Sequence, residues 1–202
     1  SHRKAHNIYG MQMVRATFDG IKKFSFPKRP FVLTRAAYAG TQRYASTWTG
    51  DNVATWEHLW IANVQMQRMC MSGYSFVGSD IGGFAEQPNG ELFARWIQLG
   101  IFHPFCRVHS SGDHGDQEPW SFGDEITDIV RKYIELRYQL LPYLYTMFHR
   151  YVKDSVPMLQ SLVYYDQEDS QTHFRTDEFL FGEQILVCPI QEPNAKGRRM
   201  YI

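Results

Sequence analysis

The sequence predicts an α/β chain that forms half of a (β/α)8 TIM barrel and then begins an all-β sandwich domain. Strand-like and helix-like segments alternate over residues 1–153, whereas two strand-like runs follow one another without a long helix at 154–202. Alternating strands and helices imply parallel strands joined by helical crossovers. A complete barrel needs eight such pairs and about 250 residues. A chain of 202 residues with this pattern therefore fits half a barrel and part of a second domain.

The first predicted elements are one helix and two strands. Apolar residues recur every three or four positions over residues 8–21, and the basic pair Lys22 and Lys23 suits a helix C-terminus. The runs PFVLTR at 30–35 and TQRYASTWTGD at 41–51 contain short, β-branched or aromatic stretches. Both are typical of buried strands.

The next pair is a helix over 56–72 and a strand over 74–80. Thr55 can cap the helix and Gly73 can end it. The strand YSFVGSD leads into a glycine-rich turn.

A third pair follows. Asn89 can cap a helix over 90–99 that Gly100 closes, and FHPFCRVH at 102–109 is a further strand candidate, weakened by Pro104. A complete small doubly wound α/β domain is the competing interpretation, but no glycine-rich phosphate turn follows any of the strands.

The longest helical pattern covers 124–153, with a kink expected at Pro142. After it, VPMLQSLVYYD at 156–166 and FLFGEQILVCPI at 179–190 are strand-like, with a polar loop over 167–178 between them. We therefore expect a domain boundary between residues 153 and 154.

Composition excludes several classes of partner. Lysine and arginine total 21 and aspartate and glutamate total 21, so no charge excess favours nucleic acid or a membrane surface. No stretch approaches the roughly 20 apolar residues of a membrane span. Aromatic residues make up 15% of the chain, and aromatic rings suit the apolar faces of sugars. The three cysteines, at long spacings, predict buried thiols rather than disulfides or a metal site.

Polar residues with catalytic potential stand just past the ends of the predicted strands: Arg35, Asp51, Asp80 and His109. Barrel active sites form at this end of the strands. Each residue alone has an ordinary explanation, because Arg35 could be an ion-pair partner, Asp80 a turn former and His109 a loop histidine. Their recurrence at successive strand ends favours a site.

Asp51 lies in the segment WTGDN, where Gly50 lets the backbone turn and the Trp48 indole could shield the carboxyl and raise its pKa. A protonated carboxyl beside a sugar is what glycoside cleavage requires. Alternatively, Asp51 or Asn52 only starts the turn into the next helix. On the residues alone, Asp51 and Asp80 could also be a catalytic pair.

The segment HSSGDHGD at 109–116 has the residue types of a metal site. Its glycine and serine content fits a mobile loop better, so we expect no metal.

At these residues the chain resembles family 31 of the glycoside hydrolases, the family of α-glucosidases and α-xylosidases. The resembling segments run in the family's order over residues 6–148: HNIYG, RPFVLTRA, QRYASTWTGDN, GSDIGGF, RWIQLGIFHPFCRVHS and ELRYQLLPYLYT. The resemblance implies that Asp51 is the general acid/base and that Trp48 lines the site of the non-reducing sugar. It also implies that Arg35, Asp80 and His109 hydrogen-bond the hydroxyls of that sugar, which makes Asp80 a binding carboxylate.

Two further residues gain roles from the resemblance. Phe84 is similar to the family's aromatic at the entrance for the leaving group, and Arg107 matches a residue that orients neighbouring carboxylates. Val108 departs from the family, which commonly has Asn there, so the hydrogen bonding around His109 is expected to differ.

The implied activity is that of a retaining, exo-acting α-glucosidase, a glycoside hydrolase (O-glycosyl hydrolase) that acts on a terminal α-linked glucose of an oligosaccharide or α-glucoside. No cofactor or metal is implied. An α-xylosidase of the same family and a non-catalytic carbohydrate-binding protein are the alternatives. The sequence does not indicate the cellular compartment, the linkage preference or the oligomeric state.

The family's nucleophile is an aspartate in a WxDMNE-like segment at the end of an earlier barrel strand, and residues 1–202 contain no such segment. We therefore expect this chain to be the second half of the barrel, with the remainder of a parent enzyme as its partner. Made alone, it is expected to hydrolyse no α-glucoside.

Overall fold

The computed structural model describes residues 1–202, which divide into two compact units, 1–48 and 49–202. Neither unit contains a helix with the length and apolar character that a membrane crossing requires.

Helix α1, His2–Phe24, opens the first unit and extends the predicted helix of 8–21 at both ends. Val14 is its buried residue. Phe18 makes an edge contact with the ring of Tyr44, with 5.8 Å between ring centroids. The middle of the predicted apolar face therefore packs, whereas Ile8 at its start is exposed.

The two predicted strands of the first unit are present but short. Strand β1, Leu33–Thr34, pairs in parallel with β2, Ser46–Trp48, and a 3-10 turn, Thr41–Arg43, lies between them in sequence. The pairing is parallel, as expected for strands of one barrel, although the connection contains only this short turn and no α-helix.

The second unit begins with two capped helices that match prediction. Helix α2, Trp56–Met71, follows Thr55, whose hydroxyl accepts a hydrogen bond at 3.2 Å from an amide of the first turn. Helix α3, Gly90–Gly100, follows Asn89, whose Oδ1 accepts one at 2.8 Å. Side-chain caps satisfy amides that have no partner within the helix.

The strands on either side of α3 are shorter than predicted. The strand expected over 74–80 is divided into β3, Val77–Gly78, and β4, Asp80–Ile81. The strand expected over 102–109 is reduced to β5, Arg107–Val108, which pairs in parallel with β4.

The residues before β5 are held in turns instead. The amides of Phe102 and His103 donate backwards to the end of α3, both at 3.0 Å, and Pro104 has no amide to give to a ladder. The Arg137 guanidinium donates to the carbonyls of Ile101, His103 and Pro104 at 2.5, 2.8 and 2.9 Å. Carbonyls bound in this way are not available to a neighbouring strand.

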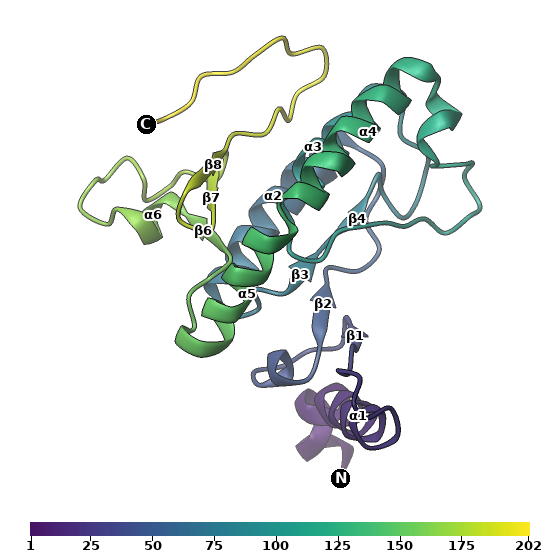
Figure 1. The fold of residues 1–202 in the computed structure, drawn as a ribbon, viewed down its shortest axis with the longest axis vertical. Helices are drawn as coiled ribbons and strands as arrows, with labels where there is room; N and C mark the ends of the chain where they lie inside the picture. The colour runs from purple at the N-terminus through teal and green to yellow at the C-terminus, as the bar shows by residue number, and fades with distance from the viewer. The chain divides into compact units, whose positions relative to one another are not determined.

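The single kinked helix expected over 124–153 is two helices, α4, Asp124–Gln139, and α5, Leu141–Asp154, which run on one after the other in Figure 1. A 3-10 turn, Pro119–Phe122, precedes α4. The break falls two residues before Pro142, whose ring removes an amide donor and clashes with a carbonyl of the preceding turn.

The last part of the chain forms a three-stranded antiparallel sheet in the order β6-β7-β8. Strand β6, Leu159–Ser161, leads directly into the short helix α6, Leu162–Tyr165. The second predicted run is a hairpin of β7, Phe179–Phe181, and β8, Ile185–Val187, because Gly182 adopts a positive φ of 66° and turns the chain.

One hydrophobic cluster joins the helices and the terminal sheet of the second unit. It includes fully buried Trp96 and Phe93 from α3, Leu59 from α2, and Phe179 and Phe181 from β7. The domain boundary between residues 153 and 154 stays a prediction. Of the cysteines, Cys70 is buried as expected, but Cys106 is exposed just before the edge strand β5 and Cys188 is half-buried.

Candidate functional site

Strand β4 begins with Asp80, a fully buried carboxylate that forms an ion pair with Arg107 of β5. Asp80 and Arg107 are register partners, and Arg107 Nη2 donates to Asp80 Oδ1 at 2.7 Å. The other oxygen, Oδ2, is buried and has no hydrogen-bond partner. Burial raises the pKa of Asp80, against the opposing effect of the guanidinium. A buried acceptor without a donor costs free energy, so Oδ2 is suited to a hydroxyl group of a ligand.

Asp51 and His109 both act on Asp80 electrostatically. The charge of His109 lowers the pKa of Asp80, and that of Asp51 raises it. Asp51 is exposed. The rings of Phe84 and His109 lie 5.3 Å apart at 40°. The second unit thus brings together these four residues and Arg107.

Arg35 and Trp48 belong to the first unit, where Arg35 directly follows β1 and Trp48 ends β2. Arg35 thus stands just past the end of a strand, as predicted. Their approach to the other site residues stays a prediction.

Sequence reasoning missed two buried amides next to the site. The Asn52 side chain bonds to backbone atoms of Asp80 and Phe84, and Gln117 Nε2 donates to the carbonyl of Gly83 at 2.9 Å. Asn52 could have been found from its place in WTGDN, where we considered it only as a turn residue. Gln117 carries no local signal, because its partner is 34 residues away.

The loop over 109–116 does not form the cluster that its composition could supply. Nowhere in the 202 residues do three or more His, Cys, Asp or Glu side chains gather as a metal site. The loop is instead held at its start, where the amide of Ser111 donates to the carbonyl of Phe84 at 2.8 Å.

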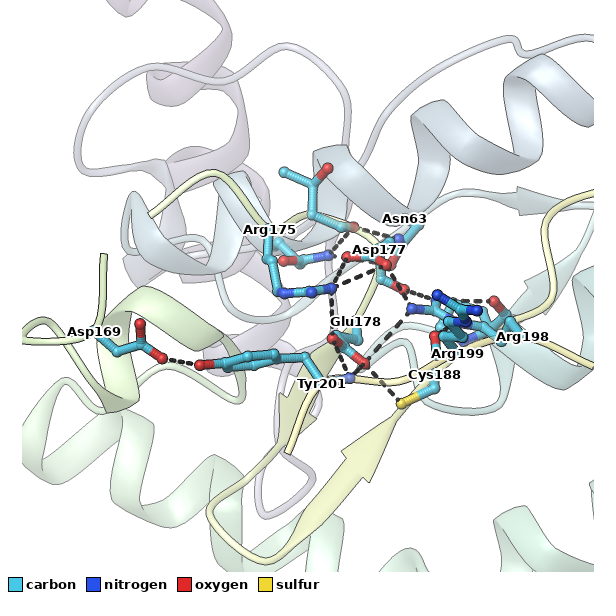
Figure 2. Close-up of polar contacts among 12 residues, drawn as sticks. Asn63, Asp169, Arg175, Asp177, Glu178, Cys188, Arg198, Arg199 and Tyr201 are labelled. Atoms are coloured by element: carbon cyan, nitrogen blue, oxygen red, sulfur yellow. Dashed lines mark hydrogen bonds and ion pairs between the residues drawn. The ribbon is translucent and has the colours of Figure 1, made fainter. Parts of the chain in front are cut away.

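A second buried carboxylate, Glu178, stands just before β7 in a network that the sequence did not predict (Figure 2). Its Oε1 accepts from Arg175 Nη1 at 3.1 Å and from the amide of Tyr201 at 3.0 Å. Its Oε2 lies 3.6 Å from Arg198 Nη2 and accepts from Cys188 Sγ at 3.2 Å. Both oxygens are therefore occupied. Burial and the adjacent carboxylate raise the pKa of the Cys188 thiol to about 12, which keeps the thiol protonated.

Two family models match the chain. The model of the glycosyl hydrolases family 31 TIM-barrel domain matches residues 1–147, and that of the glycosyl hydrolase family 31 C-terminal domain matches residues 155–202. The chain therefore belongs to glycosyl hydrolase family 31, and it contains part of the family's TIM-barrel domain followed by the start of its C-terminal domain.

Similar proteins of this family include glucosidases and a dextranase. Alpha-glucosidase 2 of Bacillus thermoamyloliquefaciens is 45% identical over 201 residues, which cover 100% of this chain and 26% of that protein. A crystal structure of ER glucosidase II, a heterodimeric complex of a catalytic subunit and the binding domain of a regulatory subunit, gives a TM-score of 0.93 at 35% identity. That match covers 96% of this chain and 22% of the other.

The Flavobacterium johnsoniae GH31 dextranase complexed with glucose gives a TM-score of 0.90 at 34% identity over 96% of this chain and 25% of the other. The chain thus spans between about a fifth and a quarter of the length of these relatives.

Proposed function

We propose that residues 1–153 form the second half of the catalytic barrel, and residues 154–202 the start of the β-sandwich, of a retaining, exo-acting α-glucosidase. The glucosidases among the similar proteins support this activity. The substrate is a terminal α-linked glucose of an oligosaccharide or a simple α-glucoside.

The observation that carries the proposal is the state of Asp80. One oxygen is held by Arg107 at 2.7 Å, and the other is buried without a donor. The exposed carboxyl of Asp51 is close enough for its charge to raise the pKa of Asp80. A sugar hydroxyl would supply the missing donor. A fixed binding carboxylate next to a solvent-accessible carboxyl is the arrangement that an acid-catalysed attack on a bound glycoside needs.

In the proposed mechanism Asp51 acts twice. As an acid it donates its proton to the glycosidic oxygen while a carboxylate nucleophile attacks the anomeric carbon and forms a glycosyl-enzyme. As a base it then takes a proton from the water that releases the sugar. The nucleophile belongs to a part of the whole enzyme outside these 202 residues.

The other residues bind the substrate. Arg35, Asp80 and His109 hydrogen-bond the hydroxyls of the terminal sugar, and Trp48 covers one of its faces. Phe84, whose ring is tilted by 40° against that of His109, lines the exit of the leaving group, and Arg107 holds Asp80 in place. No step requires a metal or a cofactor.

The test is Asp51→Ala in the full-length protein that contains these residues, assayed with an α-glucosyl disaccharide and with α-glucosyl fluoride. The disaccharide leaves as a basic alkoxide and needs the proton, so its glycosylation step should slow by on the order of 10²- to 10⁴-fold. Fluoride leaves without protonation and should still form the glycosyl-enzyme. Azide, which needs no general base, should then restore turnover.

A matched control is Asp128→Ala, which removes an exposed carboxylate paired with Arg131 at 2.6 Å and should leave both substrates unaffected. If Asp51→Ala slows both substrates equally and azide has no effect, Asp51 is not the acid/base. Wild-type turnover of an α-xyloside in preference to the α-glucoside would replace glucosidase by xylosidase. No turnover of either would favour a carbohydrate-binding protein.

A further inference from the structure

Asn52 joins the loop that carries Asp51 to the loop that follows Asp80. Its side chain is only 9% exposed. Nδ2 donates to the carbonyl of Asp80 at 2.9 Å, and Oδ1 accepts from the amide of Phe84 at 2.9 Å. The Asn52 carbonyl also accepts from the amides of Phe84 and Ala85 at 3.0 and 2.9 Å. One residue therefore binds three backbone positions of a distant loop.

Few side chains could make these bonds. The two side-chain hydrogen bonds of Asn52 need a donor and an acceptor on the same short side chain. An amide provides both, and a carboxylate does not. An aspartate at position 52 would face the Asp80 carbonyl with a second acceptor, and alanine would leave a buried carbonyl and amide with fewer partners. Because all the partners are backbone atoms, these hydrogen bonds position the main chain of the loop that follows Asp80, and they do not select a side-chain rotamer.

The loop that Asn52 binds, which follows Asp80, has little room to change its conformation. Gly83 adopts a φ of 91°, and a Cβ there would lie 2.5 Å from the backbone nitrogen of Ala54. The amide of Ala54 donates to the carbonyl of Ala85 at 2.9 Å, and Gln117 Nε2 donates to the carbonyl of Gly83 at 2.9 Å. The loop is thus fixed between two buried amides, and any shift of it is transmitted to the residues that flank Asp51.

We propose that Asn52 is a positioning residue that sets the place of the Asp51 carboxyl relative to Asp80 and Phe84. The inference rests on the function proposed above. Asp51 precedes Asn52 directly, so the anchored backbone of Asn52 fixes where the acid side chain starts. The proton must reach the glycosidic oxygen of a sugar held by Asp80, and a misplacement of about 1 Å in such a geometry costs roughly 10²-fold in rate.

The test compares Asn52→Ala and the nearly isosteric Asn52→Asp in the full-length protein, with thermal melting to confirm folding. Each variant should lose roughly 10²-fold in kcat/KM for an α-glucosyl disaccharide. The loss for α-glucosyl fluoride, which needs no proton, should be smaller by about tenfold or more. The quantity measured is the ratio of the two losses, because a lower folded fraction changes both rates equally.

The matched controls are Asn63→Ala and Asn63→Asp. Asn63 of α2 is a fully buried amide that donates to the carbonyl of Thr176 at 2.7 Å and accepts from Gln67, so its hydrogen bonds do not involve the loops that carry Asp51 and Asp80. These variants should lower stability without changing the ratio. If both Asn52 variants also leave the ratio unchanged while Asp51→Ala changes it, the positioning role is wrong and the proposed function stands. If Asp51→Ala fails to change it, the proposed function itself is wrong.

Discussion

Asp80 and Glu178 are both fully buried carboxylates next to arginines, but they differ in how many of their oxygens are used. Glu178 has both oxygens engaged by two guanidinium groups, a backbone amide and a thiol (Figure 2). Asp80 has one oxygen engaged and the other without a partner.

On the function proposed above, this difference is the one expected between a structural carboxylate, Glu178, and a binding carboxylate, Asp80. Removing one partner from a fully paired buried ion network leaves the others uncompensated, so such a network contributes to the integrity of the fold. A half-paired carboxylate lowers stability until a ligand completes it, which is the usual compromise of functional sites. Burial alone does not distinguish the two, whereas the list of hydrogen-bond partners does.

The largest expected effect on stability is that of Glu178→Gln in the full-length protein. The neutral amide leaves the guanidinium groups of Arg175 and Arg198 without full charge compensation, which costs roughly 3–5 kcal/mol for a buried pair. Chemical denaturation should show this loss, while kcat of the folded enzyme stays unchanged. Glu183→Gln, which breaks an exposed pair with Arg150 at 2.6 Å, should cost far less stability, because water and salt screen that pair. Equal losses in the two variants would contradict the structural role.

Asp80→Asn should lower activity without lowering stability, which is the reverse of the result expected for Glu178→Gln. Loss of a charged hydrogen bond to a sugar hydroxyl should lower kcat/KM by on the order of 10²-fold for disaccharide and fluoride alike. Thermal stability should be unchanged or higher. A large fall in stability with activity preserved would place Asp80 beside Glu178 as a structural residue.

The same variant has a predictable pH dependence. Because the folded-state pKa of Asp80 is raised, the folded chain holds that proton more tightly than the unfolded chain. The favourable contribution is complete below the unfolded pKa and is lost as the pH rises through the folded one. Any stability gained by Asp80→Asn should therefore be larger at pH 7 than in acid.

The effect that is smallest at neutral pH, and that grows only on acidification, concerns His103, a buried ionisable group with no hydrogen-bond partner on either ring nitrogen. Burial, and next the charge of Arg137, lower the pKa of His103 from 6.5 to about 3. Between pH 6.5 and about pH 3, His103 therefore binds a proton in the unfolded chain but not in the folded chain. The free energy of unfolding falls on acidification through this range by up to about 1.4 kcal/mol per pH unit. His103→Phe should remove this slope from a series of melting curves. The exposed His149→Phe should leave the slope as it is, and a slope that persists in His103→Phe would show that another group causes it.

Local patterns predicted the elements whose causes are local. The caps at Thr55 and Asn89 lie within three residues of the amides that they bind, so their sequence context was sufficient. The strand before Arg107 was overestimated because Arg137 takes the carbonyls of a segment more than 30 residues away. The hydrophobic periodicity of a sequence does not indicate a hydrogen bond between two such distant segments.

The site follows the same division. Asp51, Asp80 and His109 were found because they stand at the ends of the predicted strands and within motifs. In the structure Asp80 instead begins the short strand β4. The roles of all three residues stay predictions. Asn52 was passed over, since its side-chain hydrogen bonds are to atoms 28 and 32 residues away in the chain. The network of Glu178 also joins distant segments, and it was not predicted.

The contact between Gly83 and Ala54 sets a limit for anyone who wishes to redesign the site. Since even one added carbon at Gly83 would collide with backbone atoms at 2.5 Å, the two loops can be varied only together. A library of variants that randomises Gly83 would therefore consist mostly of misfolded members. Diversity is better placed at Phe84 and Val108, where the side chains are half-buried and exposed, respectively, and leave the main chain undisturbed.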